Sequence, residues 1–159
     1  MNGGSRAKTL AYPAAICLLL PGLAGCGAGG RQVTSVERKI SSSLRRADPD
    51  LAAYAENITF ANPAVRVNPE DRDELLIELD VANNGPRTVT KLYVWADFYN
   101  RGGRKAADEG ELLAHDLGVG DNSSPIPAHG SKRAIIELDS PEDWSGGKMV
   151  VSIREIRLE

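Results

Sequence analysis

The sequence predicts an all-β protein: an antiparallel β-sandwich of six or seven strands, preceded by a short amphipathic α-helix and a cleaved N-terminal leader. From about Ile58 to the C-terminus, apolar and polar residues alternate with a period of two, as in strands with one buried face. Turn-forming residues interrupt this alternation at regular intervals, and no helical pattern separates the strands. A domain of roughly 100 residues can sustain a core without disulfides.

The leader, residues 1–25, has the pattern of a signal peptide. Arg6 and Lys8 form its charged beginning, and the apolar stretch that follows is interrupted by Pro13 and Pro21. A membrane-spanning helix needs about 20 consecutive apolar residues, and the two prolines would break a run that is already too short. The leader is therefore expected to be cleaved.

The four residues Leu23-Ala24-Gly25-Cys26 close the leader and resemble the lipobox of bacterial lipoproteins. The resemblance implies a diacylglyceryl group on the Cys26 sulfur, cleavage before Cys26, and acylation of the new amino terminus. Several acyl chains together anchor a protein stably in a membrane. Gly27 follows in place of Asp, which resembles the signal for export to the outer membrane, facing the periplasm. The alternative is a plain secreted protein with an accidental cysteine.

Charge is distributed unevenly along the expected mature chain. Without Arg6 and Lys8, the 19 Lys and Arg residues fall to 17 against 22 acidic residues, a formal net charge of −5. Gly27 to Arg46 carries +4, which leaves −9 for residues 47–159. An acidic domain argues against nucleic acid as a partner. Cleavage also removes Cys17, so no internal disulfide is possible.

Residues 26–56 are predicted to form a lipidated stalk, with a Gly-rich spacer followed by an amphipathic helix. Its apolar residues recur at helical spacing: Val33, Val36, Ile40 and Leu44. Asp48 and Pro49 then predict a helix restart, with Asp48 as N-cap and Pro49 at the first helical position. The apolar stripe of this stalk could pack on its own domain, lie on the membrane or pair with a partner helix.

The β-sandwich domain is assigned to residues 57–159. Its strands are expected from Ile58 onward and then at Leu75–Ala82, Val89–Asn100, Gly110–Leu117, Arg133–Leu138 and Lys148–Leu158. The turns between them are expected at Asn83–Pro86, Arg101–Arg104 and Ser140–Asp143. Residues 118–130 show little periodicity and are expected to be a loop.

Three segments resemble FxLYD-type and related immunoglobulin-like envelope domains. They are Val81-Ala82-Asn83-Asn84-Gly85, the run from Val94 to Gly103, and Ile126-Pro127-Ala128-His129-Gly130-Ser131. The resemblance covers roughly residues 58–158 and implies an immunoglobulin-like fold and an envelope location, with no catalytic residues. The chain departs from the pattern at Asn100, where Asp is usual, and by the insertion of Ala128 and His129.

No catalytic residue, metal site or cofactor is predicted. His115 and His129 are far apart in the chain, and a metal site usually needs three or four convergent ligands. Nucleophilic serine chemistry needs a base and an oxyanion hole, and no Gly-x-Ser-x-Gly turn is present. Acidic residues gather at expected turns without the ligand spacing of a known Ca²⁺ loop, at residues 70–74, 108–111 and 139–143. Whether one of them binds Ca²⁺ stays open.

The longest strand carries the candidate binding residues. One face is apolar throughout and is assigned to the core: Leu92, Val94, Ala96 and Phe98. The other face mixes charge with Tyr93, Trp95 and Tyr99, an aromatic stripe suited to a protein or glycan partner. Alternatively, the N-terminal helix or the 118–130 loop covers this stripe, or Trp95 belongs to the core.

These observations predict a non-catalytic binding or scaffold lipoprotein of the bacterial envelope, whose partners are the membrane, through Cys26, and an unidentified envelope protein. The alternative is a small-molecule or glycan carrier with a pocket near Trp95. An open groove beside Trp95 would favour the carrier. A flat apolar patch or a free edge strand would favour the binding module.

Overall fold

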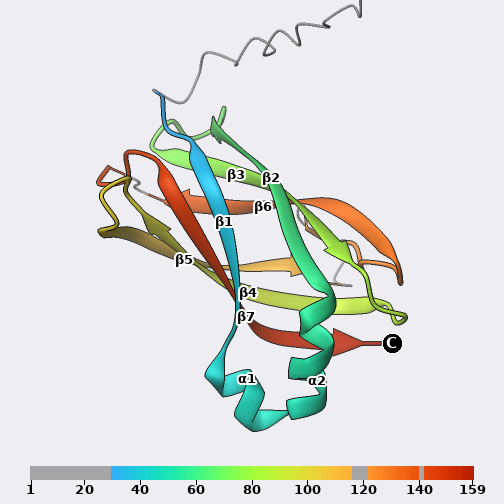
Figure 1. The fold of residues 1–159 in the computed structure, drawn as a ribbon. Helices are drawn as coiled ribbons and strands as arrows, with labels where there is room; N and C mark the ends of the chain where they lie inside the picture. The colour runs from blue at the N-terminus through green and yellow to red at the C-terminus, as the bar shows by residue number, and fades with distance from the viewer. Residues whose placement is uncertain (1–29, 116–121, 140–141) are drawn as a thin grey trace, which may run out of the picture.

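A computed structural model describes residues 30–115, 122–139 and 142–159. Two β-sheets face each other, and two short helices lie at one end (Figure 1). One sheet has the order β1 (Val33–Ile40), β7 (Gly147–Leu158), β4 (Val89–Tyr99) and β5 (Lys105–Ala114). The other has the order β2 (Ile58–Val67), β3 (Glu74–Asn83) and β6 (Gly130–Asp139). The predicted all-β sandwich is confirmed.

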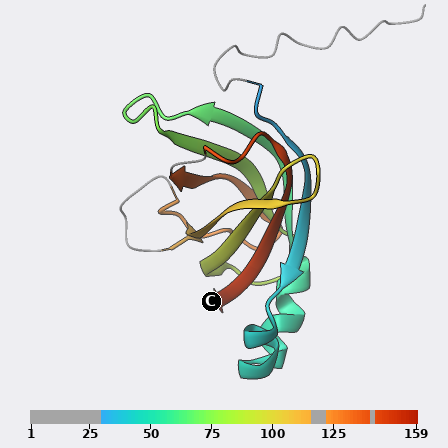
Figure 2. The same ribbon diagram turned by 90° about the vertical axis from the view of Figure 1, so that its left-hand side faces the viewer.

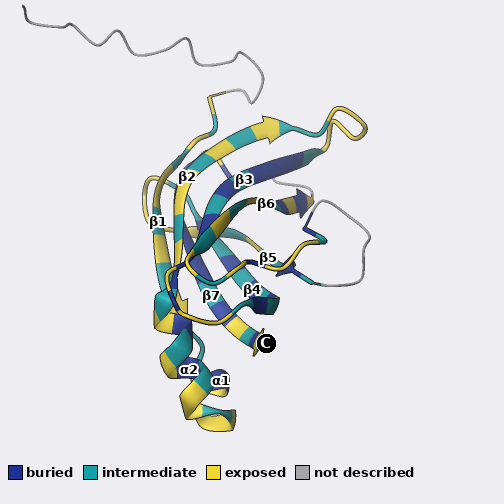
Figure 3. Ribbon diagram, turned by 90° about the vertical axis from the view of Figure 1, so that its right-hand side faces the viewer, coloured by how far each residue is buried: buried dark blue, intermediate teal, exposed yellow. Residues whose placement is uncertain are grey.

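The core lies between the two sheets and comes from alternate residues of the central strands. On β3, the fully buried residues are Ile77, Leu79 and Val81, and Figure 3 shows this strand as largely buried. On β4, the four residues assigned to the core, Leu92, Val94, Ala96 and Phe98, are all 0% exposed. The period of two in the sequence therefore identified the buried faces of both central strands.

Residues 33–40 of the predicted helical stalk form the edge strand β1, so this part of the prediction is wrong, whereas Leu44 does lie in a helix. β1 pairs in parallel with β7, whereas the other paired strands run antiparallel. Val36 and Ile40 lie four residues apart, a spacing that suits one face of a strand as well as one face of a helix. Val33 lies three residues before Val36, and a register shift between Val33 and Ser35 interrupts the regular pairing there. The sandwich therefore begins at Val33 and not at residue 57.

Arg38 explains why the strand was not recognised. It pairs with Val151 between the two inward-facing residues of β1, so a charged residue interrupts the apolar face. Its guanidinium donates to the carbonyl oxygen of Ile58 at 2.8 Å and forms an ion pair with Glu56 at 2.6 Å. The arginine thus links β1 to the start of β2.

Two helices follow β1, at the end of the sandwich opposite to the point where the chain enters β1 (Figure 1). They are α1 (Ser42–Ala47) and α2 (Pro49–Tyr54), and a single 3₁₀ turn (Ala55–Asn57) leads into β2. Asp48 caps α2 by accepting from the Leu51 N–H at 2.9 Å, with Pro49 at the first helical position, as predicted.

Tyr54 and Asn83 connect α2 to the turn between β3 and β4. The Tyr54 hydroxyl lies 3.0 Å from Asn83 Oδ1 and 2.6 Å from the Arg87 carbonyl oxygen, and it accepts from the Arg87 N–H at 3.1 Å. The Asn83 amide, fully buried, also donates to the carbonyl oxygens of Arg87 and Pro127. The side chains of Tyr54 and Asn83 therefore hold the predicted Asn-Asn-Gly-Pro turn.

The tryptophan of the core is Trp144, which lies between β6 and β7 and is 0% exposed. Its ring meets Phe98 edge to face, with centroids 5.3 Å apart. Asn100 holds this segment in place by donating to the Asp143 carbonyl oxygen at 2.9 Å and accepting from the Ser145 N–H at 2.8 Å. An Asp side chain at position 100 would have no N–H to donate to the Asp143 carbonyl oxygen, so the amide of Asn100 has a structural role here.

The remaining strand predictions hold with shifted ends. β5 begins at Lys105, five residues before the predicted start, and ends at Ala114. His115 is the last residue described after it. The predicted continuation to Leu117 lies outside the described residues, as do residues 118–121 of the predicted loop and the start of the turn at residues 140–141. Residues 122–129 of that loop form no strand, although Ile126 makes an isolated bridge with Val89, and Gly130 already belongs to β6.

Candidate functional site

The aromatic stripe lies on the outer surface of the four-stranded sheet, which is the near side in Figure 2. Because successive side chains of β4 alternate between the two faces, Tyr93, Trp95 and Tyr99 point away from the core and are partly exposed. The structure thus places all three predicted binding residues on one face of one strand. We call this surface, together with Gly110 and Arg154, the aromatic face.

Trp95 is the centre of the aromatic face. Its partner across β4 and β5 is Gly110, which has no side chain. A Cβ atom added to Gly110 would lie 2.8 Å from the Trp95 ring and would also clash with the Tyr93 hydroxyl. The two aromatic side chains therefore lean over the glycine and cover its backbone, a known way to stabilise glycine in a sheet.

Arg154, on β7, lies over the Trp95 ring, with its guanidinium carbon 4.9 Å from the ring centroid. A register shift places it there: Tyr93 pairs with Glu155 and Val94 with Ile153, so Arg154 is the extra residue of a β-bulge. A cation over an indole ring is worth about 0.5–1 kcal/mol at an exposed site. A second cation contacts the last residue of β4: Lys148, on β7, lies 5.2 Å from the Tyr99 ring centroid.

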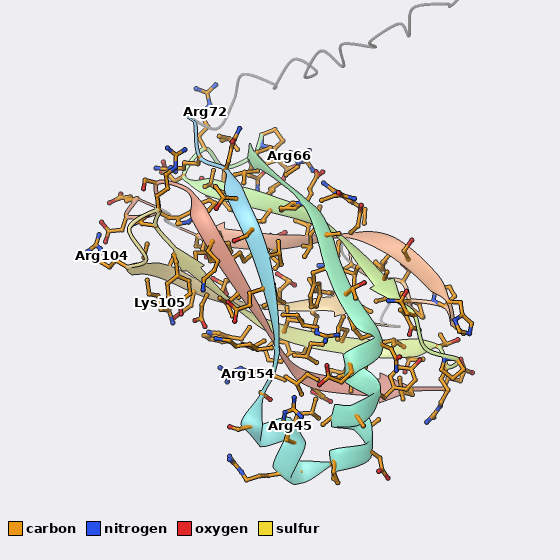
Figure 4. The ribbon with its side chains drawn as sticks, viewed as in Figure 1. Arg45, Arg66, Arg72, Arg104, Lys105 and Arg154 are labelled. Carbon is orange, nitrogen blue, oxygen red and sulfur yellow. The ribbon has the colours of Figure 1, made fainter. Side chains whose placement is uncertain are left out.

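Ion pairs surround the aromatic face. Lys91 pairs with Glu155 at 2.8 Å, and this hydrogen bond holds the pKa of Glu155 below its usual value. Lys105 pairs with both Asp108 and Asp97, and these bonds raise the pKa of the lysine. Figure 4 shows Lys105 and Arg154 on the same side of the sandwich. Exposed pairs of this kind contribute little to stability, but they neutralise the charges around Trp95.

Neither of the elements predicted to cover the aromatic stripe does so in the described residues. The N-terminal segment is β1, a strand of the same sheet, and the helices lie at one end of the sandwich (Figure 1). The described part of the 118–130 loop packs along β6, in the opposite sheet, where Asn122 contacts Ile135. Trp95 is not the core tryptophan, because Trp144 has that role.

Both edge strands of the three-stranded sheet are protected against pairing with another chain. On β6, the Asn122 amide donates to the Ile135 carbonyl oxygen at 2.8 Å and accepts from its N–H at 3.0 Å, as a neighbouring strand would. On β2, a bulge contains Asn62, whose φ is 50°, and Pro63. Bulges and prolines blunt exposed strand edges.

On β5, an edge of the four-stranded sheet, the carboxylates of Glu109 and Glu111 accept from the N–H of Gly110 and Leu112 at 3.0 Å. Burial raises the pKa of Glu111, and the neighbouring charges of Glu137 and Glu109 act in the same direction. Three of the four edge strands are therefore modified in ways that disfavour strand addition.

The other candidate residues do not converge. Among the described residues, no three His, Cys, Asp or Glu side chains are arranged to hold a metal ion. Asp71, Asp73, Glu74 and Asp139 line an open hollow of about 240 Å³, and a second hollow, of about 560 Å³, lies beside Val67 and Arg72. Trp95 lines neither of them. The predicted lipidation site, Cys26, lies outside the described residues.

Sequence reasoning missed Gly110 and Arg154, the two residues that complete the aromatic face. Both contacts depend on cross-strand register, and the one to Arg154 depends on a bulge as well. Gly110 was predicted to begin its strand, whereas it lies inside β5, and a glycine inside a strand often marks a close approach by another group.

Comparisons with known proteins provide no functional assignment. No family model matches the chain, and no curated protein matches it. One solved structure that it resembles is the X-ray structure of Northeast Structural Genomics Consortium target SoR45, at 15% sequence identity. The match covers 65% of this chain and 86% of that chain, with a TM-score of 0.31. A similarity this low carries no argument about function.

Proposed function

We propose that this protein is a lipid-anchored lipoprotein of the bacterial cell envelope, and that it acts as a non-catalytic module binding another envelope protein through its aromatic face. The observation that carries the proposal is the position of Trp95, partly exposed between Gly110 and Arg154 on a sheet face that no described element covers. Partly exposed aromatic and arginine side chains are the residue types most enriched in protein interfaces.

The anchor rests on the sequence. Within the described residues, no helix has the length and apolar character needed to cross a membrane. The lipobox ending at Cys26 supplies the attachment in this proposal. Val33 is seven positions beyond Cys26 in the sequence, a reach of at most about 25 Å, so the anchored domain would stay close to the membrane surface.

The fold also suggests an orientation. Ser152 of β7 pairs with Trp95 on one side and with Lys39 on the other, so these three residues lie at the same level of the sheet. Lys39 is near the end of β1, about 20 Å along the strand from Val33. Arg45 lies further still from the entry point, among the helices (Figure 4). The aromatic face would meet a neighbouring protein and not the protein's own membrane.

The carrier alternative has no specific observation in its favour. It requires an open pocket beside Trp95, but the indole is packed over Gly110 and under Arg154. The two hollows described above are lined by other residues.

Affinity capture tests the binding function. The lipidated protein is captured from solubilised envelope alongside two variants, Trp95→Ala and Ala64→Ser, the latter an exposed position on the opposite sheet. We expect a reproducible partner with the wild type and Ala64→Ser, and its loss with Trp95→Ala. Equal recovery with all three proteins would refute the assignment of the aromatic face.

Labelling with a palmitate analogue tests the anchor separately. Wild-type protein should incorporate the label, and Cys26→Ser should not. Equal incorporation in both proteins would contradict the lipobox interpretation, whatever the capture experiment shows.

A further inference from the structure

Arg154 differs from the other cations around the aromatic face. Lys91, Lys105, Lys148 and Arg157 each have a carboxylate partner within 4.0 Å. In the described part of the chain Arg154 has none, and its only recorded interaction is with the Trp95 ring. The aromatic face thus has one exposed positive charge, at its centre, that no carboxylate neutralises.

The contact with Trp95 prepares this arginine for binding. A guanidinium carries five N–H donors in a rigid planar group that matches the two oxygens of a carboxylate. The indole contacts the guanidinium and restricts the long side chain, so less conformational entropy is lost when a ligand binds. Donors that do not face the ring are free to make charge-assisted hydrogen bonds.

The charges nearby leave room for a new carboxylate. Asp97 and Glu155, the carboxylates on the same strands, are held by Lys105 and Lys91. Residues 47–159 carry a net charge of −9, so the positive charge of Arg154 is opposite in sign to the net charge of the domain. Complementary charge of this kind selects and orients an acidic partner more than it adds affinity.

Aromatic side chains lie on β4, the strand next to the one that carries Arg154. Tyr93 and Tyr99 lie on either side of Trp95 and on the same face of β4. Alternate residues of an extended peptide repeat every 6.8 Å or so, as they do along β4. An extended protein segment can therefore place a carboxylate on Arg154 and apolar groups on the tyrosines.

We propose that Arg154, held on Trp95, is the main contact for an Asp or Glu side chain in an acidic, extended segment of the partner protein. This inference rests on the proposed function and specifies the chemistry of the partner. The guanidinium would bind the carboxylate, and the flanking tyrosines would cover apolar side chains next to it.

The test uses the full chain in detergent and a library of random linear peptides as the probe. Peptides are selected on the wild-type protein, and their affinities are then measured for Trp95→Ala, Arg154→Gln and Arg157→Gln. Arg157 is the matched control, because it is an exposed arginine on the same strand that already has a carboxylate partner, Glu155, at 3.3 Å. Each selected peptide is also made with its Asp and Glu residues replaced by Asn and Gln.

We expect the selection to enrich acidic peptides. Their binding should weaken about tenfold or more on Arg154→Gln and in the amide versions, since one charge-assisted hydrogen bond is worth about that factor. Arg157→Gln should bind within about twofold of the wild type. The thermal midpoint of Arg154→Gln should fall by only about 2–8 °C, because the side chain is exposed and its contact with Trp95 is worth about 0.5–1 kcal/mol.

Other results separate the two proposals. Neutral peptides whose binding requires Trp95 but not Arg154 would overturn the acidic partner and leave the binding function intact. The failure of every peptide to depend on Trp95 would count against both. Self-association that Arg154→Gln abolishes would replace the partner protein by a second copy of this chain, and so would also overturn the inference.

Discussion

Trp95 and Gly110 face each other across β4 and β5, and the indole covers the space that a side chain on Gly110 would fill. The absence of a Cβ at one position therefore determines where the aromatic ring lies at the other. Arg154 also lies over the Trp95 ring, with its guanidinium carbon 4.9 Å from the ring centroid. The aromatic face is thus produced jointly by three strands, β5, β4 and β7.

Replacement of Gly110 by Ala should move the aromatic rings without disturbing the core. The new methyl group would clash with the Tyr93 hydroxyl and the Trp95 ring, which are ends of side chains and can shift. We expect a changed near-UV circular dichroism spectrum, loss of partner capture, and a free energy of unfolding within about 1 kcal/mol of the wild type. The control is Gly102→Ala, where a Cβ has no neighbour within 4 Å; equal spectra for both variants would contradict the arrangement.

The two tryptophans should differ in their effect on stability. Trp144 is fully buried against Phe98, so Trp144→Ala should lower the free energy of unfolding by about 3–5 kcal/mol. Trp95 is only partly buried, so Trp95→Ala should cost about 1 kcal/mol. Chemical denaturation of both variants provides the comparison, and a greater loss from Trp95→Ala would show that the core tryptophan has been misassigned.

Removal of the Tyr54 hydroxyl should weaken the connection between α2 and the β3–β4 turn. Tyr54→Phe deletes its contacts with Asn83 and with the backbone of Arg87. We expect a loss of about 1–2 kcal/mol in the free energy of unfolding. Tyr93→Phe is the control, because the Tyr93 hydroxyl makes no hydrogen bond with the described residues, and a loss of similar size there would argue against the Tyr54 network.

Stability should depend on pH through Glu111. Because burial raises its pKa in the folded protein, the protonated form favours folding. The corresponding stability is fully present below the unfolded pKa, about 4.5, and is lost as pH rises through the higher folded pKa. Glu111→Gln should therefore be more stable than the wild type at neutral pH, and the difference should vanish in acid.

The measurement is the thermal midpoint of the wild type and Glu111→Gln, from acid to neutral pH. Glu109→Gln is the control for the carboxylate contact to the following N–H, which both glutamates make. A difference between Glu111→Gln and the wild type that stays constant with pH would show that the glutamate does not titrate as expected.

Most strands and their buried faces could be predicted from the sequence, because the two faces of each strand differ clearly in polarity. On β4, apolar Val94 and Phe98 alternate with polar or aromatic neighbours, and all of them lie on the predicted faces. The sequence was not sufficient for β1, where Arg38 occupies an inward position and makes distant hydrogen bonds. Those bonds depend on tertiary contacts with residues about 20 positions away.

The aromatic face could be predicted only in part, for a similar reason. The alternation on β4 identified Tyr93, Trp95 and Tyr99, since it needs only local periodicity. Arg154 could not be assigned to Trp95, because a one-residue bulge changes which side chains meet. Trp144 was missed because it follows a turn and belongs to no periodic segment.

Site-specific photocrosslinking in living cells tests most directly whether the aromatic face binds an envelope protein. A photoreactive amino acid is placed at Tyr93 or Tyr99 in the lipidated protein, and at Ala64 on the opposite sheet as the control. We predict a discrete adduct with one envelope protein from the first two positions and none from Ala64. The absence of an adduct at Tyr93 and Tyr99, or the same adduct at all three positions, would contradict the central claim.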